Sequence, residues 1–586
     1  MRDGTTSVPD ETAASGMAGV HASASTLAET LAETLIDVVQ ARASTLANRT
    51  AYTFVTADGH HQERSYEAIA RRGKAIGAAL QRLIDTGDRV LLLYPPGLGY
   101  VEAFFGSLLA GAVAVPAYPP LPNRLDQRLQ AVIADAAPRV VLVPSEIMAF
   151  QAMLQAAYPA LRNVEWLASD LIGDSLASAW QAPDVGRETP AFLQYTSGST
   201  GTPRGVKVSH ANLLHNFELI RDCFGCTPDD HVVLWLPPYH DMGLIGGILA
   251  PLHIGFSATL ISPLTFLQKP LVWLQILSEK KATLGGGPNF AYDLCVRKLT
   301  REQLETLDLR HWRVAFNGAE PVRASTMERF QSTFGPRGFR AETFLPCYGL
   351  AEATLLVTGC PRDEAPKTIT VDSATLREHR VVLSEDGQTL VSSGVITGAQ
   401  EVLLVNPEER TPCPDGQVGE IWVKGGSVSE GYWNQPEAST AVFAATLADG
   451  RGPYLRTGDL GFAWQRQLYV TGRIKDLIIV DGRNHYPQDL EATIEQAHST
   501  LRAGRCVAFA VERDDGESVV VVAELQDPAE ADAAAQAIRR AIQSQHALGL
   551  GDLVWVRAGE IPKTSSGKLR RRECRARYLE GKLQLL

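Results

Sequence analysis

The sequence predicts an α/β protein: a large N-terminal part of several subdomains, with parallel sheets and a β-rich subdomain, and a small α+β part at the C-terminus. Three observations lead to this prediction. Short apolar strands alternate with amphipathic helical stretches over residues 27–188, which is the pattern of parallel β-α-β units. Turn-forming and β-branched residues dominate from about residue 360 to 480. Beyond about residue 488, one strong strand is combined with an alanine-rich helix.

The first elements follow one another in the order that parallel sheets require. Residues 88–94 form an apolar run that stops at Pro95-Pro96, which predicts a buried strand. A helical pattern follows over about 100–112, and residues 139–143 predict the next strand. The same rhythm continues in three later apolar runs, at residues 232–235, 258–261 and 314–316.

The C-terminal part is marked by a change of texture. Residues 518–523 are almost continuously β-branched and predict its main strand, and about 529–545 predict its helix. A basic run over 568–577 follows, and the segment 563–586 holds eight basic and two acidic residues. Nucleic acid or an anionic surface would explain that run, but docking of an acidic carrier protein is the explanation that we prefer.

Composition excludes several classes of function. The chain has 586 residues, of which 45% are hydrophobic and 21% charged, as in an ordinary globular enzyme. A net charge of −11 argues against nucleic acid as the main partner. No apolar run is long enough for a membrane span, and eight cysteines are too few for a disulfide scaffold. Residues 1–26 lack the basic start and apolar core of a secretory signal, so we expect a disordered tail and a cytoplasmic protein.

The strongest motif is a loop rich in glycine and hydroxyl residues. Residues 195–205 read YTSGSTGTPRG and follow the apolar run 191–193, so the loop leaves a strand. Its backbone N–H groups can converge on a phosphate, and Arg204 supplies positive charge. The Walker pattern is absent, which makes this a different kind of phosphate loop. Taken alone, the segment is equally explained as a flexible turn.

Four further segments carry polar groups suited to a nucleotide. Glu352, in YGLAEAT, follows a predicted strand and could hold Mg²⁺ against a triphosphate. Asp459, in YLRTGDLG, and Arg473, in TGRIKDLII, could bind ribose hydroxyls. Lys568 lies on a Gly/Ser loop, PKTSSGKLR, and could reach into a distant cleft. Each has an ordinary alternative: a solvated loop glutamate, turn chemistry between strands, or a basic tail.

Together and in this order, the five segments resemble the adenylate-forming superfamily of acyl-CoA synthetases, luciferases and peptide synthetase adenylation domains. The resemblance runs from about residue 27 to the end of the chain. Within the superfamily the sequence is most similar to the fatty acyl-AMP ligases. The features that point there are LPPYHDMGL at 236–244, GPNFAYDLC at 287–295 and the long stretch between Glu352 and Gly394. That stretch resembles an insertion that in fatty acyl-AMP ligases hampers transfer to CoA.

The resemblance implies an adenylation domain over 27–474 and a mobile C-terminal domain over 475–586, with the hinge at Lys475 and Asp476. It implies that a fatty acid and ATP form acyl-AMP and pyrophosphate. The acyl group then passes to the phosphopantetheine thiol of an acyl carrier protein or of a polyketide or peptide synthetase carrier domain. The cofactors expected are ATP and Mg²⁺.

The residues of the family's motifs carry over position by position. Lys568 is expected to bridge the carboxylate and the α-phosphate, Glu352 to organise Mg²⁺, and His240 to line the acyl channel as a catalytic residue. The acyl pocket is expected to contain Gly287, Pro288 and Phe290 beside His240. Contacts to ATP or AMP, including stacking of Tyr348 on adenine, are expected from Thr196, Ser197, Gly198, Ser199, Thr200, Gly201, Gly318, Ala319, Glu320, Pro321, Tyr348, Gly349, Leu350, Asp459 and Arg473.

Two positions depart from the family pattern. Ala351 stands where many relatives carry a hydroxyl residue that contacts the α-phosphate, and Thr354 or a backbone N–H is its expected substitute. Arg204 replaces the usual lysine, which keeps the charge and changes its geometry.

Other functions are weighed against this one. An acyl-CoA synthetase is the nearest alternative. An amino-acid adenylating enzyme is disfavoured because residues 239–242, YHDM, do not fit the F-D-x-S-like segment whose aspartate holds the substrate ammonium in that class. A non-catalytic sensor would not need Glu352, Asp459 and Lys568. Cys223 and Cys226 form a C-x-x-C without a second ligand pair, so zinc is not expected. None of these motifs encodes the length of the acyl chain, the identity of the carrier protein, the pathway or the oligomeric state.

Overall fold

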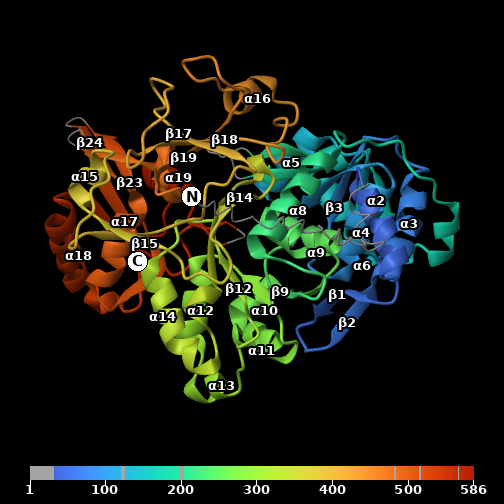
Figure 1. Ribbon diagram of the computed structural model, residues 1–586, viewed down its shortest axis with the longest axis horizontal. Helices are drawn as coiled ribbons and strands as arrows, with labels where there is room; N and C mark the ends of the chain where they lie inside the picture. Colours follow the sequence, from blue (N-terminus) through green and yellow to red (C-terminus); the bar gives the residue numbers. More distant parts are fainter. Residues whose placement is uncertain (1–31, 121–125, 197–202, 481–482, 514–515, 565–566) are drawn as a thin grey trace, which may run out of the picture.

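The computed structural model describes residues 32–120, 126–196, 203–480, 483–513, 516–564 and 567–586. The tail predicted over residues 1–26 lies outside this range. Figure 1 shows the N-terminal elements, in blue and cyan, on one side of the molecule and the C-terminal part, in orange and red, on the other. None of the described helices combines the length and apolar character needed to span a bilayer.

An eight-stranded sheet forms one half of the large part. Its strands, in order of neighbours, are β14 (Leu356–Gly359), β13 (Phe344–Gly349), β12 (Val314–Asn317), β11 (Leu284–Gly286), β9 (His231–Leu234), β10 (Ser257–Ile261), β1 (Thr50–Val55) and β2 (His61–Ser65). The pairs from β13 to β1 are parallel, and only the edge strands β14 and β2 run antiparallel to their neighbours. The strands predicted at 232–235, 258–261 and 314–316 are confirmed as β9, β10 and β12.

A six-stranded sheet forms the other half. Its order is β6 (Glu165–Ala168), β5 (Val140–Val143), β3 (Arg89–Leu93), β4 (Val113–Ala117), β7 (Pro190–Thr196) and β8 (Arg204–Ser209). All neighbours are parallel except β7 and β8. The predicted strands at 88–94 and 139–143 are confirmed as β3 and β5. Because β7 and β8 flank the predicted phosphate loop, both ends of that loop are anchored in one sheet.

Helices cover the two sheets and connect their parallel strands. The helices of the large part are α2 (Leu35–Thr45), α3 (Tyr66–Leu80), α4 (Leu98–Leu109), α5 (Gln127–Ala136), α6 (Ser145–Met148), α7 (Gln151–Ala157), α8 (His210–Phe224), the π-helix η4 (Met242–Leu249), α9 (Ala250–Ile254), α10 (Pro263–Gln268), α11 (Leu271–Glu279), α12 (Asn289–Lys298), α13 (Arg301–Glu305) and α14 (Ala324–Phe334). Every residue of α4 except Gly99 is buried. A helix that is apolar on all sides belongs inside a core, and α4 contributes Phe104 and Phe105 to the largest one.

The β-rich subdomain lies between the large sheets and the C-terminal part. It contains a two-stranded pair, β15 (Thr368–Val371) and β16 (Gln388–Val391), with α15 (Ser373–Arg377) between them. A four-stranded antiparallel sheet follows: β17 (Glu401–Val405), β18 (Gly419–Lys424), β19 (Leu455–Trp464) and β20 (Gln467–Arg473), with α16 (Pro436–Phe443) after β18. Figure 1 shows β17, β18 and β19 above the junction of the two halves of the molecule.

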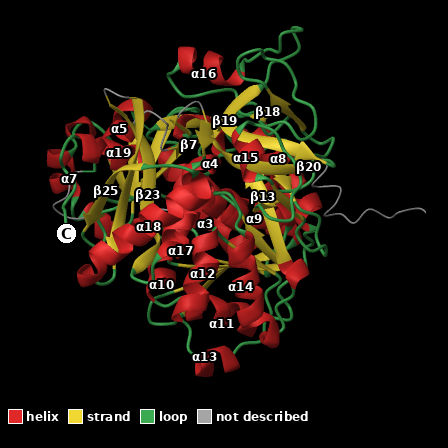
Figure 2. Cartoon of the chain, turned by 90° about the vertical axis from the view of Figure 1, so that its left-hand side faces the viewer, coloured by secondary structure: helices red, strands yellow, loops and turns green. Residues whose placement is uncertain are grey.

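The C-terminal part is a three-stranded sheet with helices on both faces. It consists of β21 (Ile478–Val480), β22 (Arg483–His485), α17 (Pro487–Ala497), β23 (Leu501–Arg513), β24 (Gly516–Leu525), α18 (Ala531–His546), β25 (Leu550–Val556) and α19 (Arg571–Leu579). Figure 2 views this part from the front, with α17 and α18 beside β23. The predicted strand 518–523 is the central β24, whose alternate residues face α17 and α18 on one side and α19 on the other. Its partners β23 and β25 are not among the sequence predictions.

Candidate functional site

A cavity of about 1630 Å³ lies where the large part, the β-rich subdomain and the C-terminal part meet. Residues 197–201 of the predicted phosphate loop lie outside the described residues. Most of the other predicted site residues line this cavity: Thr196, His240, Gly318, Ala319, Glu320, Pro321, Tyr348, Gly349, Leu350, Glu352, Asp459, Arg473, Lys475, Asp476 and Lys568. The structure therefore brings together segments from across the chain.

The remaining three predicted residues, Gly287, Pro288 and Phe290, do not belong to the lining. They lie at the start of α12, where the Phe290 ring packs on Trp235 with centroids 5.6 Å apart. A Cβ placed on Gly567 of the C-terminal part would come within 2.7 Å of the same ring. Phe290 thus forms a surface on which the Lys568 loop is seated.

Asp459 is held by two side chains. Asp459 on β19 is directly opposite Arg473 on β20 in the antiparallel pair that these two strands form. Arg473 donates from Nε to Asp459 Oδ1 at 2.8 Å, and the Tyr348 hydroxyl donates to Oδ2 at 2.8 Å. The carboxylate raises the pKa of Arg473, while burial raises that of Tyr348. The arrangement fixes an anionic acceptor at the wall of the cavity.

Glu352 lies in the short 3-10 helix η7 (Ala351–Ala353), immediately after β13. Burial raises the pKa of its carboxyl group, and its Oε1 accepts a hydrogen bond from the Tyr432 hydroxyl at 2.9 Å. The guanidinium of Arg204 lies over the Tyr432 ring, 5.2 Å from its centroid. Arg204 at the end of the phosphate loop is thereby connected to Glu352 through one aromatic side chain.

Lys568 enters the cavity from the C-terminal part. A tight turn presents it: the Thr564 N–H donates to the Lys568 carbonyl at 2.8 Å, and the Lys568 N–H donates to Thr564 Oγ1 at 3.0 Å. Burial lowers the pKa of Lys568, and the nearby carboxylates of Asp241, Glu320 and Asp459 oppose that shift. A cation is therefore placed among acidic groups of the large part.

His240 is paired with its neighbour in sequence. Its Nδ1 lies 2.5 Å from Oδ1 of Asp241. Burial alone would raise the pKa of Asp241, but His240 and Lys568 hold it below its usual value. His240 and Asp241 immediately precede η4, a π-helix, and such helices are rare and often found at functional sites.

One group of the lining residues is apolar. These residues come from α8, η4, α9, strands of the eight-stranded sheet and the loops next to them. They are Ile220, Phe224, Cys226, Val232, Met242, Gly246, Ala250, Phe256, Leu284, Phe316, Leu355 and Leu356. Most of them belong to or pack against the main hydrophobic core. The lining of one cavity thus has an apolar part, called the apolar branch below, and a polar part, called the polar chamber.

Two side chains at the site were absent from the sequence predictions. Tyr432 lies far in sequence from Glu352, and nothing in the segment GYW distinguishes it from a core tyrosine. Asp241 stands in the quoted segment LPPYHDMGL, where its adjacency to His240 was a usable signal. Thr354, the expected substitute for a hydroxyl at Ala351, is fully buried and donates to the Ser427 carbonyl instead.

The C-x-x-C cysteines are free thiols, and burial raises the pKa of Cys223 to about 12. Within the part of the chain that the structure describes, no group of three or more His, Cys, Asp or Glu side chains is arranged to hold a metal.

The chain is similar to known proteins over most of its length. A family model described as "AMP-binding enzyme" matches residues 39–433. The chain is 42% identical to the medium-chain-fatty-acid–[acyl-carrier-protein] ligase JamA of Moorena producens, over 94% of this chain and 95% of that protein. It is 38% identical to the long-chain-fatty-acid–AMP ligase FadD32 of Mycolicibacterium smegmatis, over 93% and 94% of the two chains. The chain belongs to the AMP-binding enzymes, in their fatty acyl-AMP ligase branch.

Solved structures of the fatty acyl-AMP ligases share the fold. A fatty acid AMP ligase from Legionella pneumophila has a TM-score of 0.75 and 42% identity, covering 95% of this chain and 98% of that one. A fatty acyl-adenylate ligase from the same organism was solved with acyl adenylate and pyrophosphate. A second family model, "Disco-interacting protein 2-like, AMP domain", matches residues 475–586. The predicted fold class and the predicted family are confirmed.

Proposed function

We propose that this fatty acyl-AMP ligase joins a fatty acid to AMP with ATP as the donor, and then passes the acyl group to the phosphopantetheine thiol of a carrier protein or carrier domain. The observation that carries the proposal is the single cavity with an apolar branch and a polar chamber. An aliphatic chain fits the branch lined by Phe224, Phe256 and Phe316, and its carboxylate then lies near His240 and Lys568. The named relatives act on fatty acids and, for JamA, on an acyl carrier protein.

In the first half-reaction a carboxylate oxygen attacks the α-phosphorus of ATP, and the bond to the bridging oxygen breaks as pyrophosphate leaves. Both reactants are anionic, so positioning and charge neutralisation dominate catalysis. Lys568 supplies a positive charge between the carboxylate and the α-phosphate. Asp459 accepts hydrogen bonds from the ribose hydroxyls, with Arg473 and Tyr348 holding its orientation. Glycine and hydroxyl residues of the loop after β7 bind the β- and γ-phosphates.

Glu352 is the residue that fits a Mg²⁺ ion. Its carboxylate lies in the cavity wall, and a hydrogen bond from Tyr432, whose ring lies under Arg204, fixes one oxygen. Mg²⁺ prefers one or two protein carboxylates together with phosphate oxygens and water. Glu352 would be the protein carboxylate, and ATP and water would complete the donor set. The ion would supply neutralisation of the triphosphate charge.

In the second half-reaction a thiol attacks the acyl carbonyl carbon and AMP leaves. Because acyl-AMP reacts with any suitable thiol, the choice of acceptor depends on access. We infer a carrier-bound thiol as the acceptor from the relatives and from the segment 368–391. CoA is the alternative, and relatives named as putative fatty-acid–CoA ligases are 38% identical to this chain.

The experiment that tests the proposal has two arms. ATP–pyrophosphate exchange is measured across fatty acids of graded length, and we expect exchange that depends on a fatty acid. Acyl products are then identified after adding a phosphopantetheinylated carrier protein or CoA, and we expect the carrier thioester to dominate. Absence of exchange with every acid contradicts the first half-reaction, and efficient acyl-CoA formation contradicts the proposed acceptor.

The segment 368–391 is positioned to restrain the C-terminal part. Gln388 on β16 donates to Asp489 on α17 at 2.8 Å, and Asn484 on β22 donates to the Arg377 carbonyl at 3.0 Å. Leu376 of α15 also packs in a small core that contains Tyr486. The segment therefore contacts the C-terminal part through both polar and apolar side chains.

Replacing residues 368–391 with a short glycine linker should raise acyl-CoA formation about tenfold from a low level, with acyl-AMP formation nearly unchanged. Thr368 and Val391 are paired in the β15–β16 register, so a short linker spans the gap. Gln388→Ala, which removes only the contact to Asp489, is the matched mild variant. Normal acyl-AMP formation without acyl-CoA would mean that the thiol entrance itself excludes CoA.

Gly246→Leu should shift the preferred substrate to shorter acids. A Cβ at Gly246 would lie 3.6 Å from Leu355 Cδ2, which is an ordinary van der Waals contact. We therefore expect the leucine side chain to fit and to fill part of the apolar branch. We expect the ratio of kcat/KM for long over short acids to fall about tenfold. The control is Gly246→Ala, which fits without filling the branch. An unchanged chain-length profile in Gly246→Leu would place the acyl chain elsewhere.

A further inference from the structure

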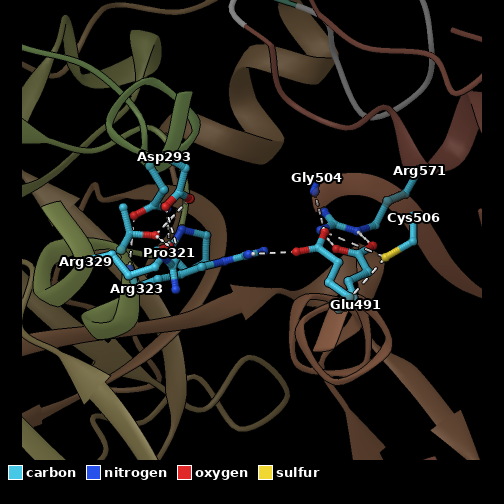
Figure 3. Close-up of polar contacts among 11 residues, drawn as sticks. Asp293, Pro321, Arg323, Arg329, Glu491, Gly504, Cys506 and Arg571 are labelled. Atoms are coloured by element: carbon cyan, nitrogen blue, oxygen red, sulfur yellow. Dashed lines mark hydrogen bonds and ion pairs between the residues drawn. The ribbon is translucent and has the colours of Figure 1, made fainter. Parts of the chain in front are cut away.

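A chain of polar contacts runs from the nucleotide side of the cavity into the C-terminal part (Figure 3). It begins at Asn289, which is buried at the start of α12. Asn289 Nδ2 donates to the Pro321 carbonyl at 2.9 Å, and its Oδ1 accepts the Arg323 N–H at 3.1 Å. One amide thereby holds both ends of the turn that follows the cavity residues 318–321.

Arg323 makes the contact between the large part and the C-terminal part. Its side chain extends from the turn before α14 and places Nη1 3.4 Å from Oε2 of Glu495 on α17. The Glu495 side chain is only 10% exposed, and its Oε1 accepts the Gly504 N–H at 2.7 Å. In Figure 3 the Arg323 side chain points from the large part toward the group around Glu491, on the C-terminal side.

Within the C-terminal part, the series of contacts continues to the loop that carries Lys568. Glu491, one helical turn before Glu495 on α17, is fully buried and binds Arg571 through two hydrogen bonds of 2.7 and 2.6 Å. Arg571 is three residues after Lys568, and its Nη1 lies 3.9 Å from Asp476 of the predicted hinge. The helix that pairs with Arg323 is thus bound to the segment that carries Lys568.

Charge supports a role for the pair beyond surface contact. Burial raises the pKa of Glu495, and Arg323 opposes that shift. Burial would lower the pKa of Arg323, but Glu495 and Glu320 together keep it above its usual value. Removing either side chain while the two parts stay docked would leave the other charge partly buried without its partner, which disfavours this arrangement of the two parts.

We propose that Arg323 and Glu495 are a positioning pair that holds the C-terminal part in the arrangement that places Lys568 in the cavity. This rests on the proposed function, because it assigns the pair to the first half-reaction. Any rotation at Lys475–Asp476 that withdraws Lys568 must separate the pair. Weakening the pair therefore disfavours acyl-AMP formation and leaves the thiol transfer unimpaired.

The test uses the full-length protein and separates the two half-reactions. In Arg323→Gln and Glu495→Gln we expect acyl-AMP formation to fall about five- to tenfold. Transfer from supplied dodecanoyl-AMP to the carrier protein should be unchanged or faster. The exchanged pair Arg323→Glu/Glu495→Arg should recover at least part of the loss. Arg329→Gln is the matched control, since Arg329 pairs at 2.7 Å with Asp293 inside the large part.

A structural readout makes the outcome independent of substrate choice. Proteolysis at the predicted hinge, Lys475 and Asp476, should be faster in the two single variants than in wild type and Arg329→Gln. Equal loss in both half-reactions, absence of rescue by the exchanged pair, or unchanged hinge proteolysis would overturn the proposal. A wild-type protein that forms no acyl-AMP would instead contradict the proposed function, and hinge proteolysis would still test the pair.

Discussion

Lys568→Ala is expected to lower the rate of acyl-AMP formation by about 10²- to 10³-fold, the range for removing one group that stabilises a transition state. Lys568 is the cation that the C-terminal part delivers among the carboxylates of Asp241, Glu320 and Asp459. As the carboxylate approaches the α-phosphate, negative charge accumulates where this ammonium is held. The side chain lines the cavity and belongs to neither core of the C-terminal part, so its loss should leave the cores intact.

The measurement is ATP–pyrophosphate exchange with a good fatty acid substrate, together with thermal unfolding. Lys563→Ala is the control: Lys563 begins the same turn, pairing with Leu569, but it is absent from the cavity lining. Burial lowers the pKa of Lys563 to about 8, so the control also removes a partly buried lysine. Exchange within a few-fold of wild type in Lys568→Ala would remove Lys568 from the mechanism.

Glu352→Gln should lower the rate at saturating ATP by about 10²-fold and shift half-saturation by Mg²⁺ to higher concentration. The amide keeps the shape of the side chain and its bond with Tyr432, but it lacks the charge that a hard dication prefers. Affinity for the nucleotide should change far less, since the residues proposed to bind ribose and phosphate remain.

The rate is followed as a function of Mg²⁺ concentration, and nucleotide binding is measured by calorimetry. Tyr432→Phe is the matched variant, because it removes the hydrogen bond to Glu352 and keeps the carboxylate. We expect a loss of only a few-fold in that variant. An unchanged Mg²⁺ dependence in Glu352→Gln would show that the ion is held by other groups.

The sequence predicted best those site residues that stand in contiguous motifs. Asp459 and Arg473 are an example: each is in its own motif, and antiparallel pairing of β19 with β20 brings them face to face. Tyr432 could not be predicted, because its place beside Glu352 depends on how the loop after β18 packs against η7. The Arg323–Glu495 pair depends likewise on the docking of two separately folded parts, for which no local pattern exists.

The fold follows the same division. Strands buried on both faces, such as β9 and β24, are continuous apolar runs, and the sequence predicts them from those runs. Strand β23 starts with polar residues around Arg502 and Arg505, which conceal its pairing with β24. Strand β25 has only Val556 fully buried, so its pattern is weak by itself.

The hydrogen-bonded group of Tyr348, Asp459 and Arg473 lies entirely before the hinge, since β20 ends at Arg473 and Lys475 follows in the next turn. In the proposed reaction the residues that bind the ribose therefore do not move with the C-terminal part. That part can withdraw Lys568 and open a path for the thiol while the acyl-AMP stays bound. The movement of the C-terminal part then does not require release of the acyl-AMP into solvent, so we expect little of it to be lost to hydrolysis between the two half-reactions.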